Sequence, residues 1–228
     1  MPSSRFVFAP ASPVAAPVTG GDLFPVRRIF CVGRNYAEHA REMGHVPGRE
    51  PPFFFMKPTD AIVTGGAGVP YPPKTADLHH EVELVVALGG GGADIAVEDA
   101  DQLIWGYAVG LDLTRRDVQQ EARKAGRPWD MGKGFDHSAP IGVIAPSTGL
   151  LTAGRVELKV DGTVRQSGDL ADMTWNIAEI IAQLSTYVTL AAGDLIFTGT
   201  PAGVSALSRG DVLEGSVTGV GTVSTRIV

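Results

Sequence analysis

The chain has 228 residues, of which 44% are hydrophobic and 19% charged, and its formal net charge is −6 at pH 7. This composition is typical of a globular protein, and the length is enough for one full hydrophobic core. The negative net charge argues against a nucleic-acid or anionic-membrane partner, because the chain has no surplus of basic residues to displace counterions.

The N-terminal region is rich in proline, alanine and valine. We expect residues 1–25 to form a lead-in with one or two short strands, packed on a main body, residues 26–228, that is a single domain. Pro10, Pro13 and Pro17 interrupt any apolar leader segment, and no apolar run approaches the 18 residues of a membrane span. These features predict a cytoplasmic protein.

The first strand of the main body is expected over residues 30–32 and contains Cys31, the only cysteine. A single cysteine excludes an intrachain disulfide and a cysteine-based zinc site, and in this apolar segment we expect a buried, unreactive thiol. Asn35 and Glu38 follow with the spacing of a capping box, which predicts a short helix that ends near Met43.

Short strands and helices follow one another along the rest of the chain. Strands are expected over residues 53–56, 61–63, 81–88, 106–112, 195–198, 212–217 and 220–228, and helices over 97–104, 115–124 and 175–187. Residues 156–160 alternate between apolar and polar side chains before Asp161 and Gly162, a type I′ turn pair, so this region predicts a hairpin. Because strands dominate and do not alternate regularly with helices, the pattern predicts an α+β fold of mostly β structure.

Two glutamates, Glu81 and Glu83, lie at the start of an otherwise apolar strand. Side chains alternate along a strand, so both carboxylates project from one face while Val82 and Leu84 face the other. Two neighbouring carboxylates resist burial as anions, and a divalent cation between them would offset that cost. The alternative is a solvent-facing edge of an amphipathic strand.

A third carboxylate, Asp112, ends a strand directly before a helix. Alone, this position is typical of a helix N-cap. Together with Glu81 and Glu83 it completes the three-carboxylate set that Mg²⁺ or Mn²⁺ favours, with coordination positions left open. Lys133 is expected to balance the excess negative charge, and its glycine neighbours would permit a close approach to a ligand. The alternative for Lys133 is an exposed loop lysine.

Two of the expected helices carry polar pairs at helical spacing. Arg116 and Gln119 lie on one face of the helix after Asp112 and are suited to hold a substrate carboxylate. His39 and Glu42 are also i, i+3 neighbours, and a histidine oriented by a carboxylate is the arrangement of a general base near neutral pH. The alternatives are a solvated helix face and a surface ion pair, respectively.

The segment 193–203 places a strand before a tight Gly-Thr-Pro turn that contains Thr200. Such a turn exposes hydroxyl and backbone N–H groups, which makes it a candidate anion cradle. It lacks the lysine and the spacing of a phosphate-binding loop, and the chain contains no nucleotide-binding motif.

Taken together, these segments resemble the fumarylacetoacetate hydrolase family, from Ile29 to the C-terminus. The resemblance rests on the order and spacing of segments 31–36 (followed by His39 and Glu42), 55–58, 80–84, 112–119, 129–135 (around Lys133) and 193–201.

The resemblance implies a β-rich fold of mixed sheets, the β-roll of the family's C-terminal domain, and a homodimer. The residues that it places on Mg²⁺ or Mn²⁺ are Glu81, Glu83 and Asp112. Those that it places around the substrate are Lys133, Gln119, Arg116 and Thr200, with His39 and Glu42 on a helix that covers the site as a lid.

Within the family the chain is most similar to the short, single-domain branch that hydrolyses acylpyruvates. This similarity implies hydrolysis of a C–C bond in a 2,4-diketo acid, with 3-fumarylpyruvate, cleaved to fumarate and pyruvate, as the expected substrate. His39, oriented by Glu42, would deprotonate the attacking water. The cations expected near the far carboxylate of this dianion are Arg34, Arg116 and Lys57.

Two other functions are consistent with the same residues. One is decarboxylation of oxaloacetate, or decarboxylation and isomerisation in homoprotocatechuate breakdown, which uses the same metal but no activated water. The other is a non-catalytic, β-rich protein with a structural metal. His39 and Glu42 favour hydrolysis, because neither alternative gives that pair a task.

Overall fold

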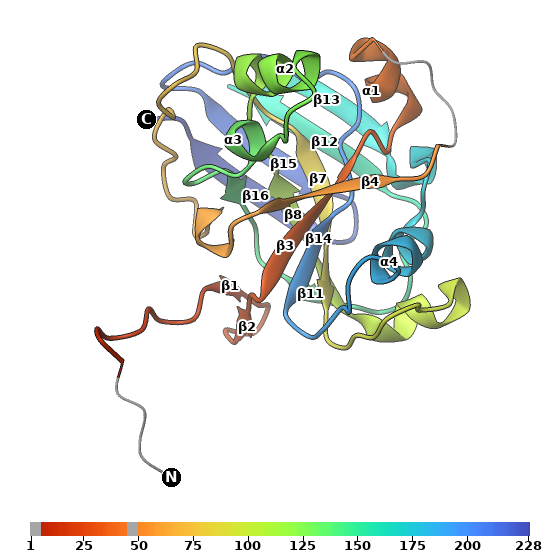
Figure 1. The fold of residues 1–228 in the computed structure, drawn as a ribbon. Helices are drawn as coiled ribbons and strands as arrows, with labels where there is room; N and C mark the ends of the chain where they lie inside the picture. Colours follow the sequence, from red (N-terminus) through yellow and green to blue (C-terminus); the bar gives the residue numbers. More distant parts are fainter. Residues whose placement is uncertain (1–5, 45–49) are drawn as a thin grey trace.

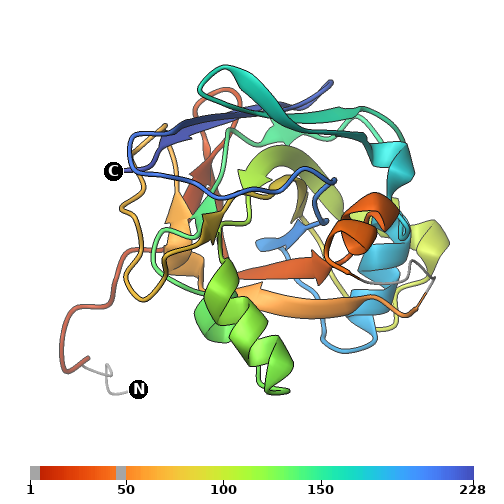
Figure 2. The same cartoon turned by 90° about the horizontal axis from the view of Figure 1, so that it is seen from above.

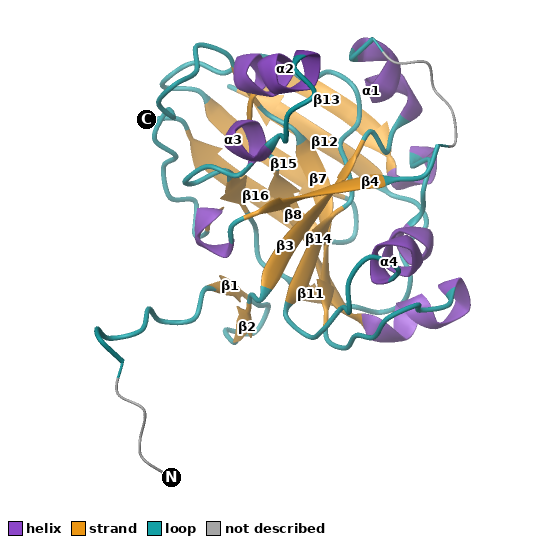
Figure 3. Ribbon diagram, in the orientation of Figure 1, coloured by secondary structure: helices purple, strands orange, loops and turns teal. Residues whose placement is uncertain are grey.

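The computed structural model describes residues 6–44 and 50–228, and strands dominate it (Figure 1, Figure 3). Six strands form a mixed sheet in the order β11 (Ala145–Pro146), β8 (Ile104–Leu111), β7 (Val82–Leu88), β14 (Asp194–Phe197), β3 (Arg28–Gly33) and β4 (Phe53–Lys57). Four form an antiparallel sheet in the order β13 (Thr163–Asp169), β12 (Arg155–Val160), β15 (Val212–Val217) and β16 (Gly221–Arg226). Figure 2 shows the second sheet lying over the first.

Three strand pairs and a few helices complete the described part of the chain. The pairs are β1 (Ala15–Pro17) with β2 (Leu23–Pro25), β5 (Ile62–Val63) with β10 (Ala139–Pro140), and β6 (Leu78–His79) with β9 (Thr114–Arg115). The α-helices are α1 (Ala37–Glu42), α2 (Arg116–Lys124), α3 (Asp130–Lys133) and α4 (Ile177–Ser185). The short 3₁₀ helices are Thr59–Ala61, Val97–Leu103 and Leu170–Asp172. This arrangement confirms the predicted α+β fold of mostly β structure.

The core has two parts, one on each face of the six-stranded sheet. Val82 and Leu84 of β7 pack in the larger part with Leu158 and Leu213 of the four-stranded sheet. Val85 faces the other part, with side chains of β3 and β14. Every residue of β7 is buried, because this central strand is covered on both faces. The sheet therefore holds the chain directly before and within β7 in a rigid, water-poor environment.

The N-terminal hairpin β1–β2 packs on the second part of the core. Ala16 and Phe24 are buried there, in the same cluster as Ile29 and Phe197. Residues 1–5 of the expected lead-in lie outside the described residues. No helix in the described part of the chain is long and apolar enough to cross a membrane.

The predicted hairpin at Asp161 and Gly162 is confirmed as β12–β13. Both turn residues have positive φ, 49° and 74°, as a type I′ turn requires. The helix expected over residues 97–104 is instead a 3₁₀ helix, Val97–Leu103. The helix expected over 175–187 is shorter, since α4 begins after a capping box formed by Asn176 and Glu179.

The capping box predicted at Asn35 is wrong. Tyr36 occupies the N-cap position of α1, and no side chain caps that helix. The buried Asn35 amide instead donates to the backbone carbonyls of Thr198, at 2.8 Å, and Trp175, at 2.9 Å. Its side chain therefore connects the end of β14 to the segment before α4. Asparagine suits both the predicted helix cap and the observed connection between two segments. Each needs a short side chain with a hydrogen-bonding carbonyl or amide.

Strand directions bring four chain segments to one edge of the six-stranded sheet. β7 runs antiparallel to both β8 and β14, and β14 runs parallel to β3. The beginning of β7 therefore lies beside the ends of β8, β14 and β3. Figure 1 shows α1 and α2 at this same edge.

Candidate metal centre and active site

The three predicted carboxylates meet at this edge of the sheet. Glu83 lies on β7, Glu81 directly precedes it, and Asp112 directly follows β8. Each offers an oxygen within 4.8 Å of the others, and their exposed fractions are only 5% for Glu81, 2% for Glu83 and 0% for Asp112. This burial excludes a solvent-facing strand edge. Asp112 is also not the N-cap of α2, because Arg115 occupies that position.

Three basic side chains surround the carboxylates. Lys133 Nζ donates to Glu81 Oε2 at 2.8 Å and to Asp112 Oδ2 at 2.7 Å. Lys57 Nζ pairs with Asp112 Oδ1 at 2.8 Å, and Arg116 donates to Glu81 Oε1. Lys133 is 2% exposed, so it is not a loop lysine in solvent. It lies where it was predicted to balance the acidic cluster.

The two glutamates of the cluster differ in their affinity for a proton. Burial acts to raise the pKa of Glu81, but the charges of Lys133 and Arg116 outweigh it and hold that pKa well below its ordinary value. Burial raises the pKa of Glu83 well above its ordinary value, and the like charges of Asp112 and Glu81 add to the effect. Glu83 is thus the carboxyl group of the cluster that holds a proton most readily when no cation is bound.

The donor set fits a divalent cation. Asp112 Oδ1 is buried and paired with Lys57, yet it accepts no hydrogen bond. Among the described residues, the Glu83 carboxylate accepts only one, from the Gly199 N–H at 2.7 Å. Hard cations prefer such oxygen ligands, and a dication would replace the proton that the raised pKa of Glu83 favours. Three carboxylates would leave other coordination positions open.

The glycine next to Lys133 allows two helices to pack closely. A Cβ on Gly132 would lie 3.0 Å from the backbone of Gln119. This glycine permits contact between α3 and α2, and its predicted role in ligand approach stays a prediction. That contact places Lys133 and Gln119 in the same cavity.

The pair His39 and Glu42 lies on α1 as predicted. His39 Nδ1 and Glu42 Oε2 are 3.1 Å apart; His39 is buried, with 7% exposed, while Glu42 lies at the surface. The Gly203 N–H donates to both Glu42 oxygens, at 3.1 and 3.2 Å. His39 lines the same cavity as Glu81 and Glu83. The contact to Glu42 leaves Nε2 as the nitrogen available to accept a proton.

The predicted anion cradle of segment 193–203 serves carboxylates of the protein itself. Its backbone N–H groups at Gly199 and Gly203 donate to Glu83 and Glu42. Gly199 has φ +97°, and a Cβ there would lie 2.7 Å from the Cβ of Asn35, so only glycine can present this N–H. Thr200 also lines the cavity.

No pattern in the sequence pointed to Gln166, which the tertiary structure places behind the metal centre. Its Oε1 accepts from Val82 N–H at 3.1 Å and lies 2.8 Å from His80 Nδ1. Its Nε2 donates to the Thr200 hydroxyl at 2.7 Å and to the Pro201 carbonyl. The Thr200 hydroxyl in turn donates to the Val82 carbonyl at 2.8 Å. Gln166 and Thr200 thus hydrogen-bond the backbone N–H and carbonyl of Val82, the residue between the two glutamates.

We predict that Gln166→Leu destabilises the protein by about 3–5 kcal/mol, because several buried polar groups lose a partner and each costs about 1–3 kcal/mol. Denaturant unfolding measures the change. Metal affinity should fall as well, since Val82 becomes less restrained. Gln102→Leu, at an exposed position, is the matched control. An unfolding free energy equal to that of the control would contradict this role for Gln166.

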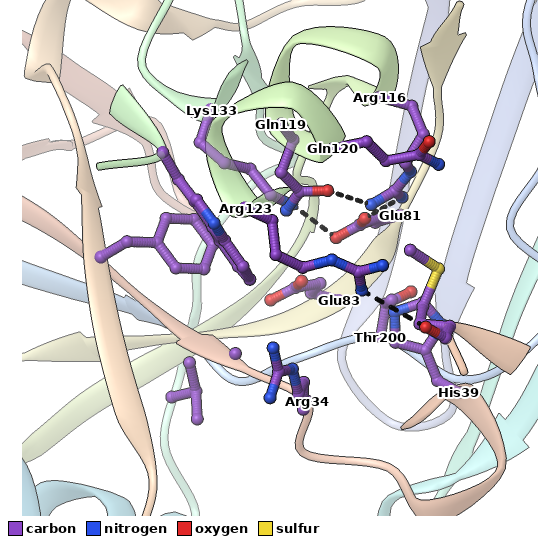
Figure 4. A pocket seen from close by; sticks show the side chains of 15 residues that line it. Arg34, His39, Glu81, Glu83, Arg116, Gln119, Gln120, Arg123, Lys133 and Thr200 are labelled. Atoms are coloured by element: carbon purple, nitrogen blue, oxygen red, sulfur yellow. Dashed lines mark hydrogen bonds and ion pairs between the residues drawn. The ribbon is translucent and has the colours of Figure 1, made fainter. Parts of the chain in front are cut away.

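Figure 4 shows the predicted side chains converging on one cavity. The predicted residues that line it are Arg34, His39, Glu81, Glu83, Arg116, Gln119, Lys133 and Thr200. Asp112 and Lys57 lie behind this surface. The cavity also contains Arg123 and Trp129, which the sequence interpretation did not select. Spacing was a usable signal for Arg123, which follows Arg116 by seven residues and so shares its helix face.

One expected substrate contact is wrong. The Lys57 side chain is 0% exposed, and its Nζ also donates to the backbone carbonyls of Leu113 and Lys133. Lys57 therefore supports Asp112 and does not reach a substrate. Arg116 is heavily engaged, since its NH1 donates to Gln119 Oε1 at 2.5 Å in addition to the contact with Glu81.

Comparisons with known proteins show the family of this chain. Residues 28–228 match the family model described as fumarylacetoacetate (FAA) hydrolase C-terminal. A fumarylpyruvate hydrolase of Ralstonia sp is 46% identical over 77% of this chain and 92% of its own length. A mitochondrial oxaloacetate decarboxylase of Dictyostelium discoideum is 40% identical over 86% of this chain and 91% of its own length.

A crystal structure of fumarylpyruvate hydrolase from Pseudomonas aeruginosa, in complex with Mn²⁺ and pyruvate, is also similar. It is 50% identical to this chain, with a TM-score of 0.96 over 98% of this chain and 99% of that one.

Proposed function

We propose that this chain, which belongs to the fumarylacetoacetate hydrolase family, hydrolyses the C–C bond between C3 and C4 of a 2,4-diketo acid. The substrate that we propose is 3-fumarylpyruvate, and the products are fumarate and pyruvate. The observation that carries the proposal is His39, which is paired with Glu42 and lines the same cavity as the buried carboxylates Glu81 and Glu83. The similar fumarylpyruvate hydrolases support the choice of substrate.

The metal ligands that we propose are Glu81, Glu83 and Asp112. When bound there, Mg²⁺ or Mn²⁺ supplies Lewis-acid stabilisation to the 2-oxo acid end of the substrate. Lys133 and Arg116, already paired with Glu81, keep that carboxylate ionised and therefore able to act as a ligand.

His39 acts as the general base in the proposed reaction. Glu42 holds its Nδ1–H, and Nε2 accepts a proton from water. The resulting hydroxide attacks C4, and the C3–C4 bond then breaks with its electron pair moving to C3. Protonation of C3 yields pyruvate, while C4 becomes a new carboxylate of fumarate. Glu42 keeps its place because the Gly203 N–H donates to it.

Lys133 and Gln119 stabilise the negative charge that develops on the substrate. Burial acts to lower the pKa of Lys133, but Asp112 and Glu81 raise it above its ordinary value, so the ammonium group stays charged. Gln119 Oε1 accepts from Arg116, which leaves the Gln119 amide N–H groups to act as donors toward the cavity.

Decarboxylation of oxaloacetate is the second candidate function, and the oxaloacetate decarboxylase relative favours it. That reaction breaks a bond to a departing carboxylate and needs no activated water. The His39–Glu42 pair would then have no proton to accept from water, which is why we favour hydrolysis.

The experiment that tests the proposal is a substrate panel. We expect the purified protein to consume fumarylpyruvate and other acylpyruvates, seen as loss of enol absorbance, and to stop when EDTA removes the metal. Oxaloacetate should be decarboxylated more slowly. Rapid oxaloacetate turnover without acylpyruvate hydrolysis would replace the proposal with the second candidate. Activity that survives complete removal of metal would contradict both.

Three expectations stay predictions. They are a homodimer, a cytoplasmic location, and a single catalytic domain over residues 26–228. Size-exclusion chromatography with light scattering measures the mass in solution and tests the first. A monomer at all concentrations used for the assay would contradict it.

A further inference from the structure

The far end of the proposed substrate needs a partner that the metal centre does not supply. Fumarylpyruvate is a dianion whose second carboxylate lies at the tip of its acyl group. Lys57 is enclosed by Asp112 and backbone carbonyls, and Arg116 is bound to Glu81 and Gln119. Neither of these two cations is placed to meet that carboxylate.

Arg34 and Arg123 occupy a different position. Both line the cavity of the metal centre, and both also line an adjoining open cavity of about 610 Å³. Phe55 and Trp129 are shared between the two cavities in the same way. The two arginines therefore lie where one cavity passes into the other, whereas Arg116 and Lys133 line only the cavity of the metal centre. In Figure 4 Arg34 lies at the opposite end of the view from Arg116, and the Arg123 side chain lies between them.

The conformation of Arg34 is unusual for a residue with a Cβ. It directly follows β3 with φ +59°, a left-handed conformation that costs energy outside glycine. Its guanidinium lies 5.2 Å from the Phe53 ring centre and 6.0 Å from that of Trp129. Among the described residues it has no hydrogen-bond or ion-pair partner. Cation–π contacts of this kind hold a guanidinium beside a ring and leave N–H groups that can donate to an anion.

The two arginines also affect each other. Burial lowers the pKa of Arg34, the positive charge of Arg123 lowers it further, and the Glu50 carboxylate acts in the opposite direction. The two positive charges therefore disfavour each other. An anion between them would remove that cost.

We propose that Arg34 and Arg123 form a distal carboxylate subsite that selects acylpyruvates with a terminal carboxylate. The planar acyl chain lies along Trp129 and Phe55, and its carboxylate accepts hydrogen bonds from the two guanidinium groups. This inference rests on the proposed function, because it assigns the far end of the same substrate. Arg123 reaches the subsite from the helix face that also carries Arg116 and Gln119.

The first test compares fumarylpyruvate with acetylpyruvate, whose acyl group ends in a methyl. Charge-assisted contacts to a carboxylate predict about 10- to 150-fold higher kcat/KM for fumarylpyruvate. Arg123→Met should reduce this preference to near parity by slowing only fumarylpyruvate, and Arg34→Met should do the same. Lys124→Met is the matched control, since this exposed neighbour on α2 loses the same charge and should keep the full preference.

The second test does not depend on turnover. Calorimetry compares the binding of fumarate with that of crotonate, in which a methyl group replaces one carboxylate. We expect Arg123→Met to weaken fumarate binding about tenfold and to leave crotonate binding unchanged. Equal effects on the two ligands, or none, would overturn the subsite even if fumarylpyruvate is hydrolysed. If no acylpyruvate is cleaved but fumarate discrimination still depends on Arg123, the proposed function fails and the subsite stands.

Discussion

Replacement of any one of the three carboxylates by its amide, in Glu81→Gln, Glu83→Gln and Asp112→Asn, should lower kcat/KM by about 10³-fold or more. The reason is that each removes one charged oxygen ligand, and a bound cation contributes several kcal/mol of charge stabilisation, at 1.36 kcal/mol for each tenfold in rate. Binding of Mg²⁺ and Mn²⁺, measured by calorimetry, should weaken in parallel. Acylpyruvate turnover measures the loss of activity.

The three amide variants also differ in a way that separates metal binding from folding. Glu81 and Asp112 each pair with buried cations, so their amides leave buried positive charge unpaired and should lower stability. Glu83 has no such ion pair among the described residues, and burial raises its pKa. Glu83→Gln should therefore lose metal binding while it keeps or gains stability. Glu121→Gln, on the exposed side of α2, is the control. Full metal affinity in Glu83→Gln would contradict the ligand set.

His39→Ala is expected to lower the rate of acylpyruvate hydrolysis by about 10²–10⁴-fold, the usual contribution of a positioned general base. Metal binding should be largely spared, because no oxygen ligand is removed. Residual decarboxylation of oxaloacetate, which needs no activated water, should also be spared. The two activities, followed in the same preparation, give the measurement.

Glu42→Gln tests how much the Glu42 charge contributes to the action of His39 as general base. It keeps the shape of the side chain but removes the charge that holds His39, so the hydrolysis rate should fall less than in His39→Ala. Glu38→Gln is its matched control, because Glu38 lies on the same helix, pairs with Arg41 at the surface and does not line the cavity. Equal losses of hydrolysis and decarboxylation in His39→Ala would show that His39 acts on binding or folding and not on water.

Local patterns determined much of the site. The two-residue period of a strand puts Glu81 and Glu83 on one face, and the structure places both in one cluster. Helical spacing pairs His39 with Glu42 and Arg116 with Gln119, and both pairs are in contact. These relations follow from backbone geometry within a few residues, so the sequence alone is enough to predict them.

The tertiary structure decided what lies beyond that range. Asp112 joins the glutamates only because β7 and β8 pair antiparallel, which brings together residues about 30 positions apart in the chain. Lys57 supports Asp112 from β4, an edge strand of the same sheet, and Gln166 holds Val82 from the other sheet. Asn35 had a local capping pattern, but buried carbonyls from distant segments compete for its amide and determine its role. Such contacts depend on strand order and burial, which the periodicity of a single segment does not encode.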